Sequence, residues 1–162
     1  MNKTGMAACG LAVCLGVLTA KQAYAFEQAG FHSGMTLAEA KEIALNYGTP
    51  LTKMNIGNVN SYSIGEPPKS KGVVQFCHDR LYFISQNIPG EVDAFAEHVE
   101  AFARQFGAPG VSAASGHTQD GFMSYVTLEW STPEGEKVTA SISRFQERSW
   151  ASVTKTASGI CK

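Results

Sequence analysis

Apolar residues recur at helical spacing after Gly34, and the flanking residues predict where that helix begins and ends. Thr36 followed by Glu39 predicts a capping box, in which each side chain satisfies a backbone donor of the other residue. Gly48 and then Pro50 end the helix. Its apolar positions are Leu37, Ala40, Ala44 and Tyr47.

A second helix is predicted from about Glu91 to Phe106, with acidic residues in its first turn. Its apolar stripe consists of Val92, Phe95, Val99, Phe102 and Phe106. Like the first, it ends in an aromatic residue, Gly, any residue and Pro, and the two endings align at an offset of 59 positions. We therefore predict a duplication, with repeats at 26–89 and 90–162. The alternative is coincidence, because helices often close in this way.

Segments with strand character follow each helix. After the first helix they are Leu51–Asn58, Ser61–Gly65, Val73–Cys77 and Leu81–Gln86. After the second they are Phe122–Thr132, Val138–Arg144 and Ser149–Lys155. The pattern predicts an α+β fold, in which two helices pack on one face of a curved, mainly antiparallel sheet.

Alternation along the late strands assigns their side chains to two faces. Val126, Leu128 and Trp130 share the apolar face of their strand, as Val138, Ala140 and Ile142 do in the next. The opposite face is polar and carries aromatic residues, which is typical of a protein-recognition surface. Its candidate binding residues are Tyr125, Thr127, Glu129, Ser141, Ser143 and Trp150. The alternative is an ordinary solvated sheet.

Two Gly-, Ser- and Pro-containing stretches, Glu66–Gly72 and Gly110–Gly121, are predicted to be loops. The second is long enough to serve as a lid or a binding loop, or to be simply mobile.

The N-terminal segment has the pattern of a cleaved secretory signal peptide. Lys3 precedes a run of 15 uncharged residues, and Ala23-Tyr24-Ala25 supplies a small-x-small cleavage site. The run is shorter than the roughly 20 residues that span a bilayer, and no later stretch is long enough to do so. We expect residues 1–25 to be removed and 26–162 to form one soluble domain, periplasmic or secreted.

Net charge argues against nucleic acid as a partner. The whole chain has 13 basic and 14 acidic side chains, and loss of Lys3 and Lys21 leaves 11 basic against 14 acidic. Cleavage also leaves Cys77 and Cys161 as the two cysteines of the mature chain. In an oxidising compartment such a pair predicts one disulfide, although a metal pair or a catalytic thiol are alternatives.

Candidate catalytic chemistry is sparse. The four histidines show no metal-ligand spacing, so neither a metal nor a cofactor is expected. His78 beside Asp79 could form the acid–base pair of a small hydrolase, but a tight hairpin turn accounts for the same residues. There is no nucleophile elbow, P-loop or dinucleotide fingerprint.

Gly34-Met35-Thr36, the helix that follows and Tyr47-Gly48-Thr49-Pro50 resemble a superfamily of exported bacterial proteins. That superfamily joins the beta-lactamase inhibitory protein to the small SmpA/OmlA-type outer-membrane lipoproteins. The resemblance implies tandem helix-plus-sheet repeats and, for the inhibitory protein, a concave sheet that grips a partner enzyme. The chain departs from it at Phe26, where the lipoproteins have a lipidated Cys, and in having one cysteine pair rather than one per repeat.

Together these patterns predict an exported, non-enzymatic binding protein. It would recognise a protein partner in the cell envelope, or a small ligand, through the polar sheet face and the Gly110–Gly121 loop. The alternatives are a small periplasmic hydrolase centred on His78 and Asp79, and a structural component of the cell envelope.

Overall fold

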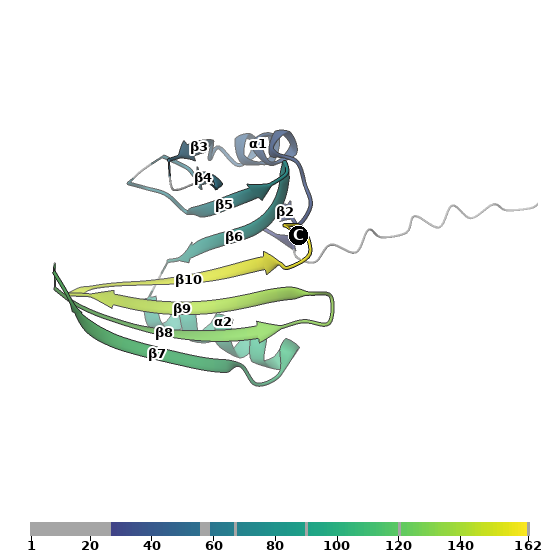
Figure 1. The fold of residues 1–162 in the computed structure, drawn as a ribbon. Coiled ribbons are helices and arrows are strands. Elements are labelled where there is room, and N and C mark those ends of the chain that lie inside the picture. The colour runs from purple at the N-terminus through teal and green to yellow at the C-terminus, as the bar shows by residue number, and fades with distance from the viewer. Residues whose placement is uncertain (1–26, 56–58, 67, 90, 120, 162) are drawn as a thin grey trace, which may run out of the picture.

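The structure is a computed structural model that describes residues 27–55, 59–66, 68–89, 91–119 and 121–161. The predicted signal peptide, 1–25, lies outside these residues. The fold is α+β, as predicted, and the described residues form two helices and a curved, antiparallel sheet (Figure 1). No helix in the described part of the chain has the length and apolarity needed to cross a membrane.

The helices and strands follow one another in two series, and each series consists of one helix and four strands. A short hairpin of β1 (Glu27–Gln28) and β2 (Phe31–His32) comes first. The first series is α1 (Leu37–Asn46), β3 (Leu51–Met54), β4 (Asn60–Ile64), β5 (Gly72–Cys77) and β6 (Arg80–Ile88). The second series is α2 (Glu91–Phe106), β7 (Gly110–Thr118), β8 (Gly121–Ser131), β9 (Glu136–Phe145) and β10 (Arg148–Ala157).

The main sheet has eight strands in the order β3-β4-β5-β6-β10-β9-β8-β7, and all neighbours are antiparallel (Figure 1). Each series is a helix followed by a four-strand meander. The last strands of the two meanders, β6 and β10, pair with each other and join the halves. This arrangement leaves β3 and β7 as the two edges.

The prediction of a loop at Gly110–Gly121 is wrong. Gly110–Thr118 forms β7, which pairs with β8 along its whole length, from Gly110 opposite Glu129 to Thr118 opposite Gly121. Glycine, serine and alanine have little strand preference of their own, so the segment gives no strand signal. The segment is a strand because its backbone pairs with β8, and not because its own residues favour a strand.

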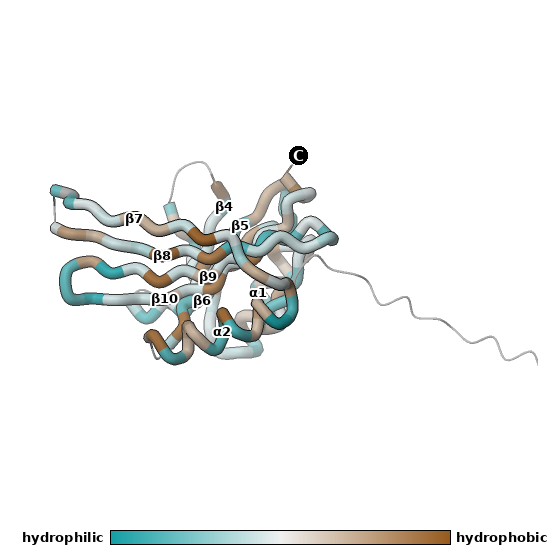
Figure 2. Tube along the Cα trace, turned by 90° about the horizontal axis from the view of Figure 1, so that it is seen from below, coloured by the Kyte–Doolittle hydropathy of each residue, from teal (hydrophilic) through white to brown (hydrophobic). Residues whose placement is uncertain are grey.

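Both helices cover the same face of the sheet, here called the inner face (Figure 2). Ile84 and Ile88 on β6 have the same parity, and the first packs in the core beneath α1 while the second packs in the core beneath α2. Apolar alternation in β8 and β9 therefore points inward, as the sequence predicts. On the opposite face, the outer face, the described part of the chain places no helix.

Contacts at the helix ends follow the sequence signals. The capping box is confirmed, because Thr36 and Glu39 bind each other's backbone N–H groups. At the end of α2 the indole Nε1 of buried Trp130 donates to the carbonyl oxygen of Gly107 at 2.9 Å. That bond ties the stop of the helix to the sheet beneath it.

The free ends of β7–β10 reach past the end of α2 in both views (Figures 1 and 2). Val126 on β8 belongs to the inner face by its parity, yet it is exposed. At these strand ends, no element of the described residues covers either face of the sheet.

Candidate functional site

The six predicted binding residues lie together on the outer face of β8, β9 and β10. Ser143 on β9 opposes Tyr125 on β8 and also Trp150 on β10, so these three form one row across the sheet. Ser141 opposes Thr127 in the next row, and Glu129 opposes Thr139 in the row after it. Side chains that oppose each other share a face, so the parity predicted from sequence is the parity observed.

Aromatic side chains at one end of this surface are exposed. Tyr125 is 39% and Trp150 46% exposed, whereas the other tryptophan, Trp130, is 3% exposed in the core. An exposed indole on a sheet is unusual because burying its large apolar area is favourable. Trp150 is therefore the residue of this face whose burial by a partner would be most favourable.

Two further residues, Met123 and Phe145, extend the surface. They oppose each other one row beyond Tyr125 and have the same parity as Tyr125 and Ser143. Met123 is exposed and Phe145 is half-buried. These two residues could have been predicted from the sequence, because the alternation of β8 and β9 extends to Met123 and Phe145. We call Met123, Tyr125, Phe145 and Trp150 the aromatic patch.

Small hydroxyl side chains border the aromatic patch. Thr127 and Ser141 are hydrogen-bonded at 3.1 Å between their hydroxyl oxygens. Further across the sheet the Thr154 hydroxyl donates to Ser85 on β6 at 3.0 Å. These cross-strand bonds hold the polar part of the outer face in a fixed arrangement, with backbone pairing beneath it.

Glu129 is engaged in an ion pair within the chain. Its Oε2 lies 2.6 Å from Nζ of Lys137, and both side chains remain nearly half exposed. The polar end of the surface therefore carries one negative and one positive charge. Glu129 and Lys137 therefore present an exposed ion pair at this end of the surface.

A small hollow of about 190 Å³ lies behind the patch, with Tyr125 and Ser143 among its lining residues. Most of its lining side chains have inner-face parity: Ser124, Val126, Ile142, Arg144 and Ser149. The strands are thus hollowed on the helix side, directly behind the aromatic patch.

His78 and Asp79 form the turn between β5 and β6. Both have positive φ, 49° and 60°, which is the backbone of a tight two-residue hairpin. The Asp79 carboxylate accepts a bond of 3.4 Å from the backbone N–H of Leu37, at the start of α1. The turn interpretation of these residues accounts for both their geometry and their contacts.

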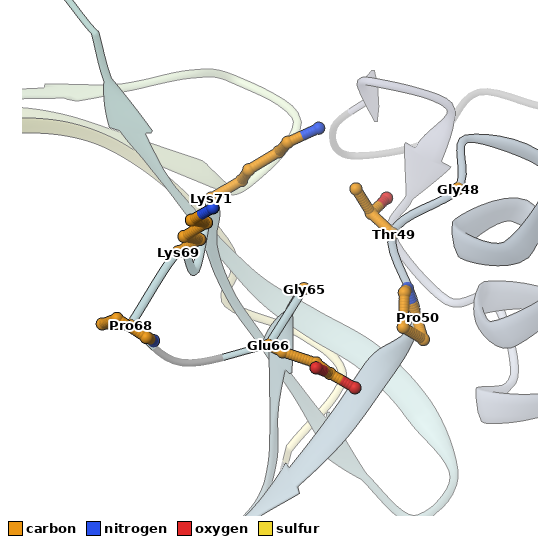
Figure 3. A pocket seen from close by; sticks show the side chains of 8 residues that line it. All are labelled: Gly48, Thr49, Pro50, Gly65, Glu66, Pro68, Lys69 and Lys71. Carbon is orange, nitrogen blue, oxygen red and sulfur yellow. The ribbon is translucent and has the colours of Figure 1, made fainter.

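A second hollow, about 630 Å³, lies at the other end of the molecule, between the segment after α1 and the segment between β4 and β5 (Figure 3). Lys71 extends across it toward Thr49, while Glu66 lies on the side of Pro50 (Figure 3). All its charged residues are exposed, so they are well solvated and present no preorganised site.

Cys77 and Cys161 are free thiols in the structure. They are nevertheless neighbours: desolvation first, and then a hydrogen bond with Cys77 and the charge of Cys77, raise the pKa of Cys161 to about 11. The same two cysteines, after burial, raise the pKa of the Tyr82 hydroxyl on β6. The C-terminal tail therefore lies against the β5–β6 hairpin.

Within the described ranges, no three His, Cys, Asp or Glu side chains gather closely enough to hold a metal ion. Comparison of the chain with protein-family models, curated proteins and solved structures finds no match. Functional inference therefore rests on the surface itself.

Proposed function

We propose that this chain is an exported, non-enzymatic binding protein that recognises a protein partner through the outer face of β8–β10. The observation that carries the proposal is the aromatic patch, in which Tyr125 and Trp150 are exposed in the same cross-strand row. Tyrosine, tryptophan, phenylalanine and methionine are enriched in protein interfaces, and a few such anchors carry most of the binding free energy.

The surroundings of the patch support a protein rather than a small ligand as the partner. A small ligand binds in a concave site that covers most of its surface. The aromatic patch instead lies on an open sheet face bordered by Thr127, Ser141 and Ser143, which resembles the apolar centre and polar rim of a protein interface. A partner of this kind would cover the patch and exclude water from it.

Export is part of the proposal. It rests on the 15-residue apolar run, the small-x-small site before Phe26 and the pair of cysteines left after cleavage. The N-terminal sequence of the chain purified from the periplasm or medium should begin at Phe26. A chain that retains Met1, or that is found in the cytoplasm, would contradict export without affecting the surface.

The binding surface is tested by removing its two exposed rings. Tagged natural chain is used to capture proteins from an envelope extract, and each captured protein is quantified by mass spectrometry. With Tyr125→Ala/Trp150→Ala, we expect the affinity for the specific partner to fall by about 30-fold or more, because two anchors are lost. Tyr47→Ala is the matched control, since Tyr47 is also an exposed aromatic but lies at the end of α1.

A partner that binds the natural chain and Tyr47→Ala but not the double variant would support the proposal. Equal capture by all three proteins would contradict the assignment of this surface. Retention of the natural chain with peptidoglycan or membranes, independent of Tyr125 and Trp150, would favour the structural envelope component instead.

A further inference from the structure

Strand β7 is a long edge strand, and no element among the described residues covers either of its faces. Every residue from Gly110 to His117 is exposed, including Val111 at 67%. Helix α2 packs against β6, β8, β9 and β10, and β7 lies beyond this layer. Pairing with β8 uses one side of its backbone, so the N–H and C=O groups of alternate residues point out of the sheet.

Edge strands normally carry features that prevent pairing with another chain, such as shortness, charge or proline. The opposite edge, β3, has two of them, because it spans only Leu51–Met54 and carries an exposed lysine, Lys53. Strand β7 has nine residues, and none of them is Lys, Arg, Asp, Glu or Pro. The β3 edge is thus protected against pairing with another chain, whereas the β7 edge is not.

We infer that β7 pairs antiparallel with β7 of a second copy of this chain, so that two eight-stranded sheets become one continuous sheet. A two-fold axis perpendicular to the sheet at β7 produces this pairing and keeps the two outer faces on the same side. The strand meets its own copy without opposing like charges, since it has none.

A second copy fits this edge better than an extended segment of another protein. Strand addition takes its affinity from main-chain bonds and its sequence specificity from pockets for alternate side chains. The side chains in the middle of β7, from Ser112 to Gly116, are small and offer no such pockets. Its backbone contains no proline, so the main-chain groups along the edge can still form hydrogen bonds with another strand.

The arrangement also closes after two copies. Once both β7 edges are paired, the free edges of the joined sheet are β3 and its counterpart, which are short and carry Lys53. Pairing of β3 with β7 would instead build an open filament, and the lysine disfavours it. Because β8 lies next to β7, the joint brings the two aromatic patches to the middle of one long outer face.

The inference is tested by sedimentation of the purified chain over a range of concentrations, beside Ser112→Lys/Ser115→Lys. We expect the natural chain to form a dimer, and the variant to dimerise about tenfold more weakly or worse, because each face of the edge strand then carries a lysine, and charged side chains on an edge disfavour pairing with another chain. Ser149→Lys/Ser158→Lys is the matched control; it adds the same charge at exposed serines outside β7 and should dimerise as the natural chain does.

Hydrogen exchange of the natural chain gives a second measurement that needs no variant. Amides of β7 should exchange more slowly in concentrated than in dilute protein, while those of β3 should not change. A natural chain that stays monomeric at every concentration, a dimer that tolerates both β7 lysines, or protection that appears outside β7 would each overturn the inference. If circular dichroism shows that the β7 variant does not fold, the exchange measurement decides.

Discussion

Tyr125 and Trp150 oppose the same residue, Ser143, from the two strands on either side of β9. Two aromatic side chains that are 25 positions apart in sequence are thus brought into one row on the outer face, and both are exposed. Exposing large apolar rings to water is costly, and Tyr125 and Trp150 leave 39% and 46% of their surface exposed. This relationship is the basis of the proposed binding surface.

Gly72 is predicted to be essential for the sheet. A Cβ at this position would lie 2.1 Å from the backbone oxygen of Ser85, so the paired strands β5 and β6 would have to separate. We expect Gly72→Ala to lower the free energy of unfolding by about 1–3 kcal/mol. Gly116→Ala on β7 is the control, because nothing lies within 4 Å of the added methyl group, and it should change stability by less than about 0.5 kcal/mol. Urea denaturation measures both, and equal effects would contradict the close approach.

Glu136 is predicted to make stability depend on pH. It is buried at the start of β9, and burial raises its pKa from the ordinary value of 4.5 although Lys155, 3.5 Å away, lowers it. The folded state therefore holds this proton more tightly than the unfolded chain does, and its stabilising effect is lost as pH rises through the raised pKa.

The Glu136→Gln variant should have the melting temperature of the natural chain below about pH 4, where the carboxyl is protonated in both states. It should be the more stable protein at pH 7. Glu147→Gln removes the same charge at the exposed β9–β10 turn and serves as the control. A difference between Glu136→Gln and the natural chain that is the same at every pH would rule out this account of Glu136.

Cys77 and Cys161 are predicted to form a disulfide in the exported protein. The two thiols are free and not at disulfide distance in the structure, but desolvation and then the neighbouring Cys77 raise the pKa of Cys161 to about 11, so Cys161 is protonated at neutral pH. Oxidation therefore depends on the oxidant of the compartment rather than on a reactive thiolate. Closing a loop of this length stabilises a protein by about 4 kcal/mol in the chain-entropy model.

Non-reducing peptide mapping of the exported chain should find Cys77 linked to Cys161. Reduction of the natural chain and the Cys161→Ser substitution should lower the melting temperature by the same amount, since both remove one crosslink. Two titratable thiols in the native exported protein would show that the cysteines stay reduced.

Patterns that depend on side-chain alternation could be predicted from the sequence. The helices, the capping box and the opposite faces of Thr127 and Leu128 follow from local periodicity, and the structure has them. The duplication stays a prediction, although β7 gives the second series the same four strands as the first. The family resemblance likewise stays a prediction, because no comparison bears on it.

Features that depend on non-local pairing could not be predicted. The Gly-Ser-Ala segment of β7 has no alternation, and only its pairing with β8 makes it a strand. The sequence predicts β9 only from Val138, but Glu136 is the first residue of this strand, opposes Ala157 and is buried. The neighbourhood of Cys161 and Tyr82 is likewise set by the path of the C-terminal tail.

Photocrosslinking in living cells tests most directly whether Tyr125 and Trp150 contact a protein partner. A photoreactive benzoyl-phenylalanine replaces Tyr125 in one strain, Trp150 in a second and Tyr47 in a third. We expect the same protein adduct from positions 125 and 150, competed away by natural chain but not by Tyr125→Ala/Trp150→Ala, and no such adduct from position 47. Equal adducts from all three positions, or an adduct from position 47 alone, would contradict the proposed binding surface.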